Sequence, residues 1–465
     1  MQLVAYGAQH VFLTGTPEIT FWKVSYRRHT NFAMESIEQT FSGQADFGRR
    51  VTCTISRNGD LAYRTYLQVT LPEINQDVAS GDVYARWLDF VGEQLIAQVE
   101  IEVGGQRIDR QYGDWMHIWN QLTLSKEQQS GYYKMIGNTT QLTYITDPTF
   151  AAVSGPCAST SAPSQVCAPR NALPETTLYV PLQFWYCRNP GLALPLIALQ
   201  YHEVKINIDF RPIGECLWAV NTLADASGAS KSVAAAYQQS LVAASLYVDY
   251  IFLDTDERRK MAQNPHEYLI EQVQFTGDES VGSSSNKIKL NFNHPCKELV
   301  WVVQPDANVD YCSSLEGGST LYKTLGAQPF NYTDAIDALP NAIHAFGGDN
   351  ATSGDNGVIS GGVFQMNEAA DVSGIDAATL GSALSDAGTF VLAETALDMH
   401  CWGENPVVTA KLQLNGQDRF SEREGSYFDT VQPFQHHTRA PDAGINVYSF
   451  ALRPEEHQPS GSCNF

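Results

Sequence analysis

The residues best suited to metal chemistry in this sequence are histidines and cysteines that lie close together. His436 and His437 are adjacent, and His294 lies two positions before Cys296. A zinc site needs three or four such ligands, and neighbouring residues on a strand point to opposite faces of a sheet. Neither pair has further ligands at a suitable spacing. The sequence therefore predicts hydrogen-bonded or surface side chains here, with no metal and no other cofactor.

Patterns of catalytic residues are also absent from the sequence. It contains neither the nucleophile pattern G-x-S-x-G nor the phosphate- and dinucleotide-binding patterns G-x-x-x-x-G-K-[ST] and G-x-G-x-x-G. Gly104-Gly105 and the GSSSN run at 282–286 fit turns. Carboxylates are so abundant that pairs of them arise by chance and identify no acid–base couple. We expect no catalytic residues and a protein that is not an enzyme.

Three asparagines, Asn138, Asn331 and Asn350, lie in the N-x-S/T pattern that accepts N-linked glycans. The N-terminal MQLVAYGAQH lacks the basic and then apolar segments of a secretory signal, so we expect folding in a reducing cytoplasm. The three asparagines are therefore candidate glycosylation sites without the secretory context that such sites normally have.

The chain contains nine cysteines, an odd number spread over its whole length. In a reducing compartment this predicts mostly buried thiols and no disulfide framework. Cys157 and Cys167 differ from the rest because they bracket a loop rich in Pro, Ser and Ala. They are a candidate loop disulfide, and two free thiols are the alternative.

Arg27 and Arg28 form a compact basic cluster near one end of the chain, within FWKVSYRRHTNF. They fit a contact with an acidic partner or lipid headgroups and, equally, a solvated strand edge. The whole chain carries 51 acidic against 29 basic residues and a net charge of −22, which opposes binding to phosphate backbones. We therefore expect no direct contact with nucleic acid.

Apolar residues recur at every second position over much of the chain, which predicts β-strands. Val51–Asn58 alternates in this way and meets Asn58-Gly59, a strong hairpin signal, before the alternating Leu61–Leu71. We expect a tight hairpin there. Helical patterns are few and short. Further strands are expected at Val99–Val103, Ser245–Leu253, Lys287–Asn293 and Ala410–Leu414.

Weak internal matches indicate that a β domain is duplicated. Ile101–Gly113 aligns with Leu412–Gly425 through Gly-Gln and a closing Gly, and two shorter pairs of segments match in the same order. Between the copies, Asp254 and Glu257 begin a short helix, which Asn264-Pro265 ends. The expected organisation is an N-terminal arm at 1–24, a first domain at 25–254, a helical linker at 255–264 and a second domain at 265–465.

Two segments are expected to be long exposed loops. Residues 327–392 contain eight acidic residues and no Lys or Arg, and residues 146–177 contain five prolines. The alignment of the two copies also leaves the second one about 55 residues short, roughly two strands. We therefore expect an incomplete second domain and a natural chain that continues beyond Phe465.

Distinctive segments run in order from one end of the chain to the other. They include LVAYGAQHVFLTGTPEITFWKVSYRRHTNFAMESIEQTF (Leu3–Phe41), ISRNGDL (Ile55–Leu61), PGLALPLIALQYHEVK (Pro190–Lys205), YVDYIFLDTDERR (Tyr247–Arg259), KLQLNGQDRF (Lys411–Phe420) and LRPEEHQPSGSCNF (Leu452–Phe465). These segments closely resemble the major capsid proteins of nucleocytoplasmic large DNA viruses, especially those that infect algae and amoebae.

The resemblance implies an all-β chain of two consecutive eight-stranded antiparallel jelly rolls. It also implies a structural function, in which three chains form a pseudo-hexagonal capsomer and the capsomers tile an icosahedral virion shell. Members of the family continue beyond the CNF of Cys463–Phe465, which agrees with an incomplete second jelly roll.

The resemblance also implies an orientation and a set of partners. The loops at 146–177 and 327–392 would face outward, whereas the arm with Arg27 and Arg28 would lie on the inner side. The implied partners are two further copies in a homotrimer, neighbouring capsomers, minor capsid and penton proteins, and a nearby inner membrane. The implied location is the virion capsid, assembled in the cytoplasm of the host cell.

Two other classes of function remain open at this point. A carbohydrate-binding jelly roll is favoured if aromatic residues such as Phe330 and Tyr332 form exposed platforms. An enzyme on a jelly-roll scaffold is disfavoured by the missing motifs, because a fold alone never establishes an activity.

Overall fold

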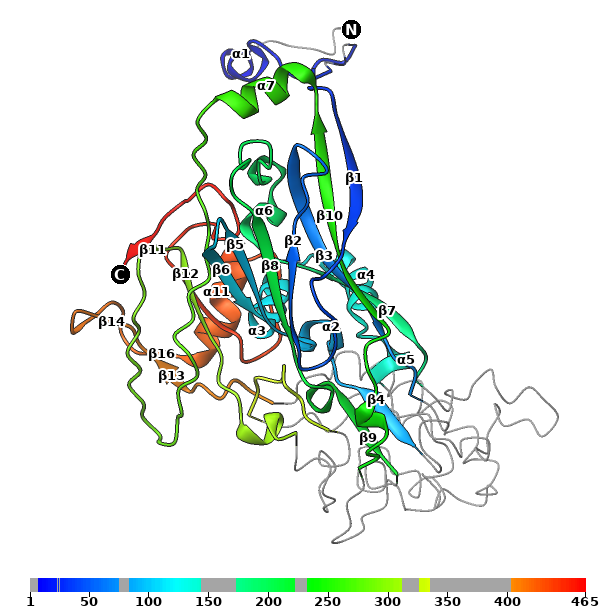
Figure 1. Ribbon diagram of the computed structural model, residues 1–465. Helices are drawn as coiled ribbons and strands as arrows, with labels where there is room; N and C mark the ends of the chain where they lie inside the picture. The colour runs from blue at the N-terminus through cyan, green and yellow to red at the C-terminus, as the bar shows by residue number, and fades with distance from the viewer. Residues whose placement is uncertain are drawn as a thin grey trace, which may run out of the picture.

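The first half of the chain is a sandwich of two antiparallel sheets (Figure 1). The computed structural model describes residues 7–22, 24, 26–74, 83–143, 173–221, 232–311, 326–334 and 403–465. Within these residues, one sheet has the order β1 (Phe32–Gln39), β10 (Ala243–Leu253), β3 (Leu61–Leu71) and β7 (Thr176–Pro181). The other has the order β2 (Arg50–Thr54), β8 (Val204–Phe210), β5 (Ile96–Val103) and β6 (Gln106–Tyr112). Two facing four-stranded sheets in this order form a jelly roll, so the predicted eight-stranded first unit is confirmed.

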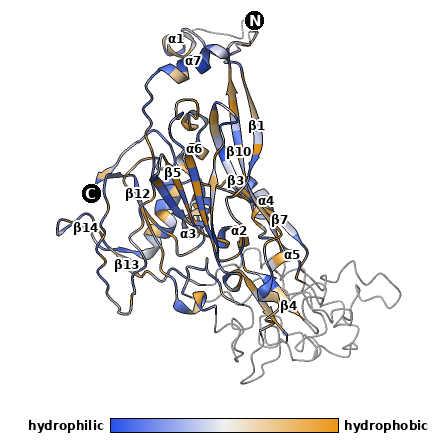
Figure 2. Ribbon diagram, in the orientation of Figure 1, coloured by the Kyte–Doolittle hydropathy of each residue, from blue (hydrophilic) through white to orange (hydrophobic). Residues whose placement is uncertain are grey.

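Alternating side chains explain why these strands form a sandwich. On β3, Leu67, Val69 and Leu71 are completely buried, whereas Arg64, nearer the start of the strand, is exposed. Leu246 on β10 is buried in the same core, which receives side chains from both sheets. Figure 2 shows apolar residues concentrated on the strands, while the connecting segments are more hydrophilic. Burial of each such Leu or Val side chain contributes about 1.5–3 kcal/mol.

The predicted hairpin at Asn58-Gly59 is wrong. β2 and β3 belong to different sheets and do not pair, so the segment between them crosses from one sheet to the other. A Cβ atom on Gly59 would lie 2.7 Å from the Cβ of Tyr250, whose hydroxyl donates a hydrogen bond to the carbonyl oxygen of Ser56 at 2.6 Å. The glycine therefore permits close packing against Tyr250, and the local Asn-Gly signal does not indicate a turn.

Helices are more extensive than the expected few short segments. α3 (Gly113–Thr123) and α4 (Lys126–Ile136) have eleven residues each and follow β6 in the chain. The connecting helix is present as α7 (Thr255–Gln263), where the Asp254 carboxylate accepts a hydrogen bond from the backbone N–H of Thr255 at 2.8 Å. Further elements of this half include α1 (Ala8–Thr14), β4 (Tyr84–Trp87), α2 (Val91–Gln94), α5 (Thr140–Thr143), α6 (Trp185–Arg188) and β9 (Leu217–Val220), of which β4 and β9 pair.

The second half contains short antiparallel ladders in its described residues. β11 (Pro295–Cys296) pairs with β18 (Cys463–Asn464), β12 (Glu298–Trp301) with β17 (Asn446–Ser449), β13 (Thr409–Ala410) with β16 (Arg423–Glu424), and β14 (Gln413–Leu414) with β15 (Gln417–Asp418). A π-helical turn at Tyr427–Val431 leads into α11 (Gln432–His436). The strand expected at Lys287–Asn293 is wrong, because no ladder forms there. Its alternating residues lack a neighbouring strand among those described.

Two hairpins support the duplication inferred from the sequence. Gly104 and Gly105 join β5 to β6 with φ angles of 61° and 84°, and Asn415 and Gly416 join β14 to β15 with φ angles of 52° and 80°. Positive φ at both central residues is the geometry of the two-residue turn that matches the twist of paired strands. The aligned segments of the two halves therefore share a turn as well as a Gly-Gln motif.

Candidate functional site

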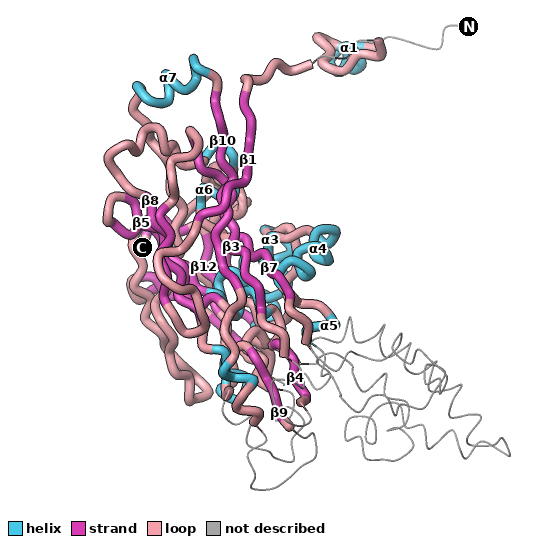
Figure 3. The backbone as a smooth tube through the Cα atoms, turned by 45° about the vertical axis from the view of Figure 1, so that its right-hand side comes forward, coloured by secondary structure: helices cyan, strands magenta, loops and turns pink. Residues whose placement is uncertain are grey.

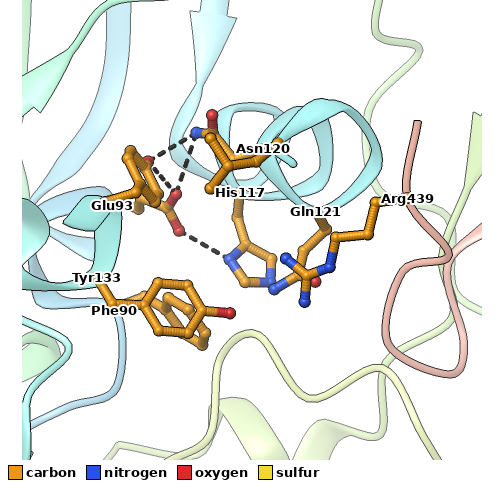
Figure 4. A pocket seen from close by; sticks show the side chains of 9 residues that line it. Phe90, Glu93, His117, Asn120, Gln121, Tyr133 and Arg439 are labelled. Carbon is orange, nitrogen blue, oxygen red and sulfur yellow. Dashed lines mark hydrogen bonds and ion pairs between the residues drawn. The ribbon is translucent and has the colours of Figure 1, made fainter. Parts of the chain in front are cut away.

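A buried hydrogen-bond network centred on Glu93 lies where the two halves of the chain meet (Figure 4). The Glu93 carboxylate pairs with His117 Nδ1 at 2.7 Å and accepts a hydrogen bond from the Tyr132 hydroxyl at 2.5 Å. Asn120 donates to the Tyr132 hydroxyl oxygen at 2.7 Å and to Glu93 at 3.3 Å. Burial and the adjacent carboxylate raise the pKa of Tyr132 well above its usual value. The network fixes α2, α3 and α4 relative to one another.

The second half of the chain closes over this network. Phe330 stacks on His117, with 4.3 Å between the ring centroids. Arg439 lines the same small pocket as Glu93 and His117 (Figure 4). Tyr332 is only 3% exposed and packs in a cluster with Leu122 of α3 and Val447 of β17. Phe330 and Tyr332 therefore do not form the exposed platform that would favour carbohydrate binding, because both rings pack at the joint between the halves.

Burial at the joint also corrects the predicted start of the acidic insertion. Ala327 is 4% exposed, and Gln328 and Thr333 are buried as well. These residues belong to the packed joint, so an exposed loop does not begin at Ala327. Residues 335–392 of the predicted insertion lie outside the described residues.

A second contact between the halves is ionic. Arg188 of α6 lies over the Trp119 ring at 3.9 Å and pairs with Glu271 at 3.3 Å, and Lys297 pairs with the same carboxylate. Burial lowers the pKa of Arg188, while Glu271 and Asp109 oppose that shift. Burial raises the pKa of Asp109 to about 6, although its carboxylate accepts a backbone hydrogen bond from Val273 at 3.3 Å. These contacts join α6 and β6 to the start of the second half.

A third charged cluster stabilises the second half itself. The His437 side chain is completely buried and lies 2.8 Å from Glu298 of β12 and 2.9 Å from Glu455. Burial alone would lower the pKa of His437, but hydrogen bonds to these two carboxylates raise it to about 9. A charged His437 therefore ties β12 to the segment that follows β17.

The N-terminal arm exposes apolar side chains far beyond what an ordinary surface shows. The arm leads away from the sheets at the end of the molecule where α7 lies (Figure 3). Phe12, Phe21 and Trp22 are 89%, 89% and 91% exposed. Arg27 and Arg28 follow and are exposed as well. Contiguous exposed apolar residues of this kind mark an interaction surface.

A row of tyrosines forms another candidate contact surface, on the outer face of the β1-β10-β3-β7 sheet. Tyr247 of β10 stacks on Tyr66 of β3 at 5.4 Å, and Tyr66 lies 6.3 Å from Tyr179 of β7. Tyr179 is 40% exposed. Side chains on adjacent strands place these rings side by side, so they offer a continuous aromatic surface.

Two of the three candidate glycosylation sites lie among the described residues. The Asn138 side chain accepts a hydrogen bond from the backbone of Phe90 at 3.3 Å, and the Asn331 amide donates to Gln328 at 2.8 Å. Asn350, Cys157 and Cys167 lie outside the described residues.

A metal-binding cluster is absent from the part of the chain that the structure describes. No group of three His, Cys, Asp or Glu side chains is placed to hold a metal ion there. The described helices are too short or too polar to cross a membrane. The candidate functional features are therefore the exposed N-terminal arm, the tyrosine row and the joint between the halves.

Comparison with known proteins identifies the family. Residues 20–254 match the family described as the major capsid protein N-terminus. Residues 257–465 match the family described as the large eukaryotic DNA virus major capsid protein. The chain belongs to the viral major capsid proteins. The sequence resemblance is confirmed over both halves.

Individual relatives agree with this assignment. The chain is 78% identical to the major capsid protein of Phaeocystis pouchetii virus, over 100% of this chain and 90% of that protein. It is 69% identical to the major capsid protein of Chrysochromulina ericina virus, over 100% of this chain and 91% of the relative. The crystal structure of PBCV-1 VP54, fitted into a reconstruction of the virophage Sputnik, superposes with a TM-score of 0.61 and 32% identity, over 96% of this chain and 84% of that one. The chain is thus a structural capsid protein with the double jelly-roll fold.

One feature of the sequence, an isolated charge in an apolar segment, indicates a contact at the joint. Arg188 is the single charged residue in the long apolar run between Glu175 and Glu203. A lone charge in such a run needs a partner when it is buried. The partner, Glu271, is 83 positions away and only folding brings it close.

Proposed function

We propose that three copies of this major capsid protein associate into a pseudo-hexagonal capsomer and that capsomers tile an icosahedral shell. The observation that carries the proposal is the packed joint between the halves, where Leu122, Tyr332 and Val447 share one apolar cluster. A joint of this kind fixes two similar units in one rigid subunit. Three such subunits then present six units around a closed ring.

Apolar contacts must drive this association. Each chain has a net charge of −22, and bringing three together increases electrostatic repulsion. Stable protein interfaces bury roughly 1,200–2,000 Å² or more of surface. The tyrosine row at Tyr66, Tyr179 and Tyr247 and the exposed arm are surfaces on which such burial is favourable.

The arm is proposed to lie on the inner side of the shell. Exposed Phe12, Phe21 and Trp22 followed by Arg27 and Arg28 combine apolar insertion with positive charge. That combination suits minor capsid or penton proteins, or anionic lipid of an inner membrane. The segments 146–172 and 335–392 of the two expected loops are proposed to face outward. Glycans at Asn138, Asn331 or Asn350 and a disulfide between Cys157 and Cys167 are further hypotheses.

The proposed role is purely structural, with no enzymatic activity and no direct contact with nucleic acid. The negative charge supports the second point, and assembly in the host cytoplasm fits the free thiols of the cysteines that the structure describes. The carbohydrate-binding alternative loses its basis at Phe330 and Tyr332, because the joint uses both rings.

Light scattering coupled to size-exclusion chromatography tests the proposal. The expected molar mass is three times the 51.3 kDa of one chain, at micromolar concentration and neutral pH. The matched control is a variant with Tyr66, Tyr179 and Tyr247 changed to serine, which tests whether that face contributes. A wild-type chain that elutes as a folded monomer at every concentration would count against the capsomer proposal.

A further inference from the structure

Two cysteines face each other across a ladder that closes the second half of the chain. Cys296 of β11 and Cys463 of β18 are direct register partners, 167 positions apart in sequence. Both are free thiols and both are partly exposed. The other described cysteines, Cys53, Cys187 and Cys216, are buried. We propose that Cys296 and Cys463 are a redox site that closes to a disulfide under oxidising conditions.

The backbone geometry permits that bond. Opposed residues in an antiparallel pair have Cα atoms about 4.5–5.5 Å apart. Disulfides form over Cα separations of roughly 4.4–6.8 Å. The two thiols therefore need side-chain rotation and no large movement of the backbone. The Cys296 thiol now donates to the carbonyl oxygen of Glu298 at 3.0 Å, a weak contact that rotation would break.

Aromatic packing holds the Cys463 strand in register. The Phe465 ring centroid lies 5.9 Å from that of Phe292 and 6.0 Å from that of Phe450. The backbone N–H of Phe450 donates to the carbonyl oxygen of Lys297 at 2.8 Å, next to Cys296. These contacts keep the thiols opposite each other before any bond forms, which favours their pairing over capture of external thiols.

The two thiols have different roles in the exchange. Burial raises the pKa of the Cys296 thiol to about 11, so it is the poorer initial nucleophile at neutral pH. Cys463 therefore attacks first, as its thiolate, on a sulfur of a small disulfide such as oxidised glutathione. One glutathione thiolate leaves and a mixed disulfide forms on Cys463. Cys296 then loses its proton and displaces the second glutathione.

The exchange is balanced and reversible. The protein loses two protons and two electrons and gains one S–S bond, while one disulfide donor becomes two thiols. The bond encloses most of the second half in a covalent loop, which restricts its unfolded ensemble. The reduced form is kept where thiols predominate, and the closed form accumulates in surroundings where disulfides predominate. A capsid subunit that leaves a reducing cell would thus become locked.

The experiment uses the 465-residue chain, equilibrated in buffers in which the ratio of reduced to oxidised glutathione is varied. Free thiols are blocked by alkylation, and peptides are then mapped without reduction. The expected result is a linked pair of peptides that contain Cys296 and Cys463, together with Cys53, Cys187 and Cys216 recovered as alkylated thiols that carry neither glutathione nor a cross-link. The unfolding midpoint of the oxidised form is expected to rise by about 5–10 °C.

Two variants sharpen the test. Cys296→Ser should leave glutathione trapped on Cys463, because the resolving thiol is missing. A double variant, Cys463→Ser with Ser462→Cys, moves the thiol by one position to the opposite face of the strand. This shifted thiol should not link to Cys296. The proposal is overturned if wild-type protein accumulates glutathione on Cys463 without the internal bond. It is equally overturned if the shifted thiol links as readily, since the register would then be irrelevant.

Discussion

Shortening Leu122 should loosen the joint between the two jelly rolls without unfolding the first. Leu122 is completely buried, and its side chain packs with Tyr332, Ile445 and Val447 across the joint. Leu→Ala at such a site removes buried apolar surface and leaves a cavity, at a cost of about 2–5 kcal/mol. The Leu122 carbonyl oxygen accepts a hydrogen bond from the backbone N–H of Arg439 at 3.1 Å, and the substitution preserves that contact.

Hydrogen exchange on the isolated subunit measures this effect. A loss of 2 kcal/mol corresponds to roughly a 30-fold increase in the exchange rate of amides that open with the joint. In Leu122→Ala we expect that increase in β12 and β17, with wild-type rates in β3 and β10. The matched control, Leu67→Ala, removes an equally buried leucine from the first core and should give the reverse pattern. Equal acceleration of all four strands in Leu122→Ala would refute the joint as a separate contact.

Four further outcomes are expected. The pKa of His437 is raised to about 9, so the stability that charged His437 contributes is complete below about pH 6.5 and is lost as pH rises through 9. Calorimetry should therefore show a smaller loss of stability at alkaline pH for His437→Gln than for the wild type. The pKa of Asp109 is raised to about 6, so stability falls as pH rises from about 4 to 6, and Asp109→Asn should remove this fall. Co-sedimentation with anionic vesicles should be lost in a variant with Trp22→Ser, Arg27→Gln and Arg28→Gln, and unchanged vesicle binding would contradict the inner-side role of the arm. High salt should leave the trimer intact, whereas its dissociation would show that ion pairs hold it.

The strands of the first jelly roll are those the sequence predicts best. β5 and β10 have alternating apolar residues because one face of each packs in the core. α3 is not predicted because Tyr112 at its N-cap offers no capping side chain and because both the first core and the joint bury its residues. Local signals fail where tertiary packing determines the conformation, as it does at Gly59.

The residue pairs that form the joint, and the opposed cysteines, could not be predicted for a different reason. Glu93 is 24 positions from His117, and Cys296 is far from Cys463, so their contacts exist only after the chain has folded. Nothing in the residue types alone selects Cys463 as the partner of Cys296 among nine cysteines. Such contacts depend on register between distant strands, which alternation of apolar residues does not specify.

The mass of the purified subunit in solution tests the central claim most directly. If this major capsid protein builds capsomers from its own copies, sedimentation or light scattering at increasing concentration should converge on three times 51.3 kDa. Cryo-electron microscopy of that species should then show six jelly rolls around one three-fold axis. A folded chain that stays at 51.3 kDa over the whole concentration range would contradict the claim.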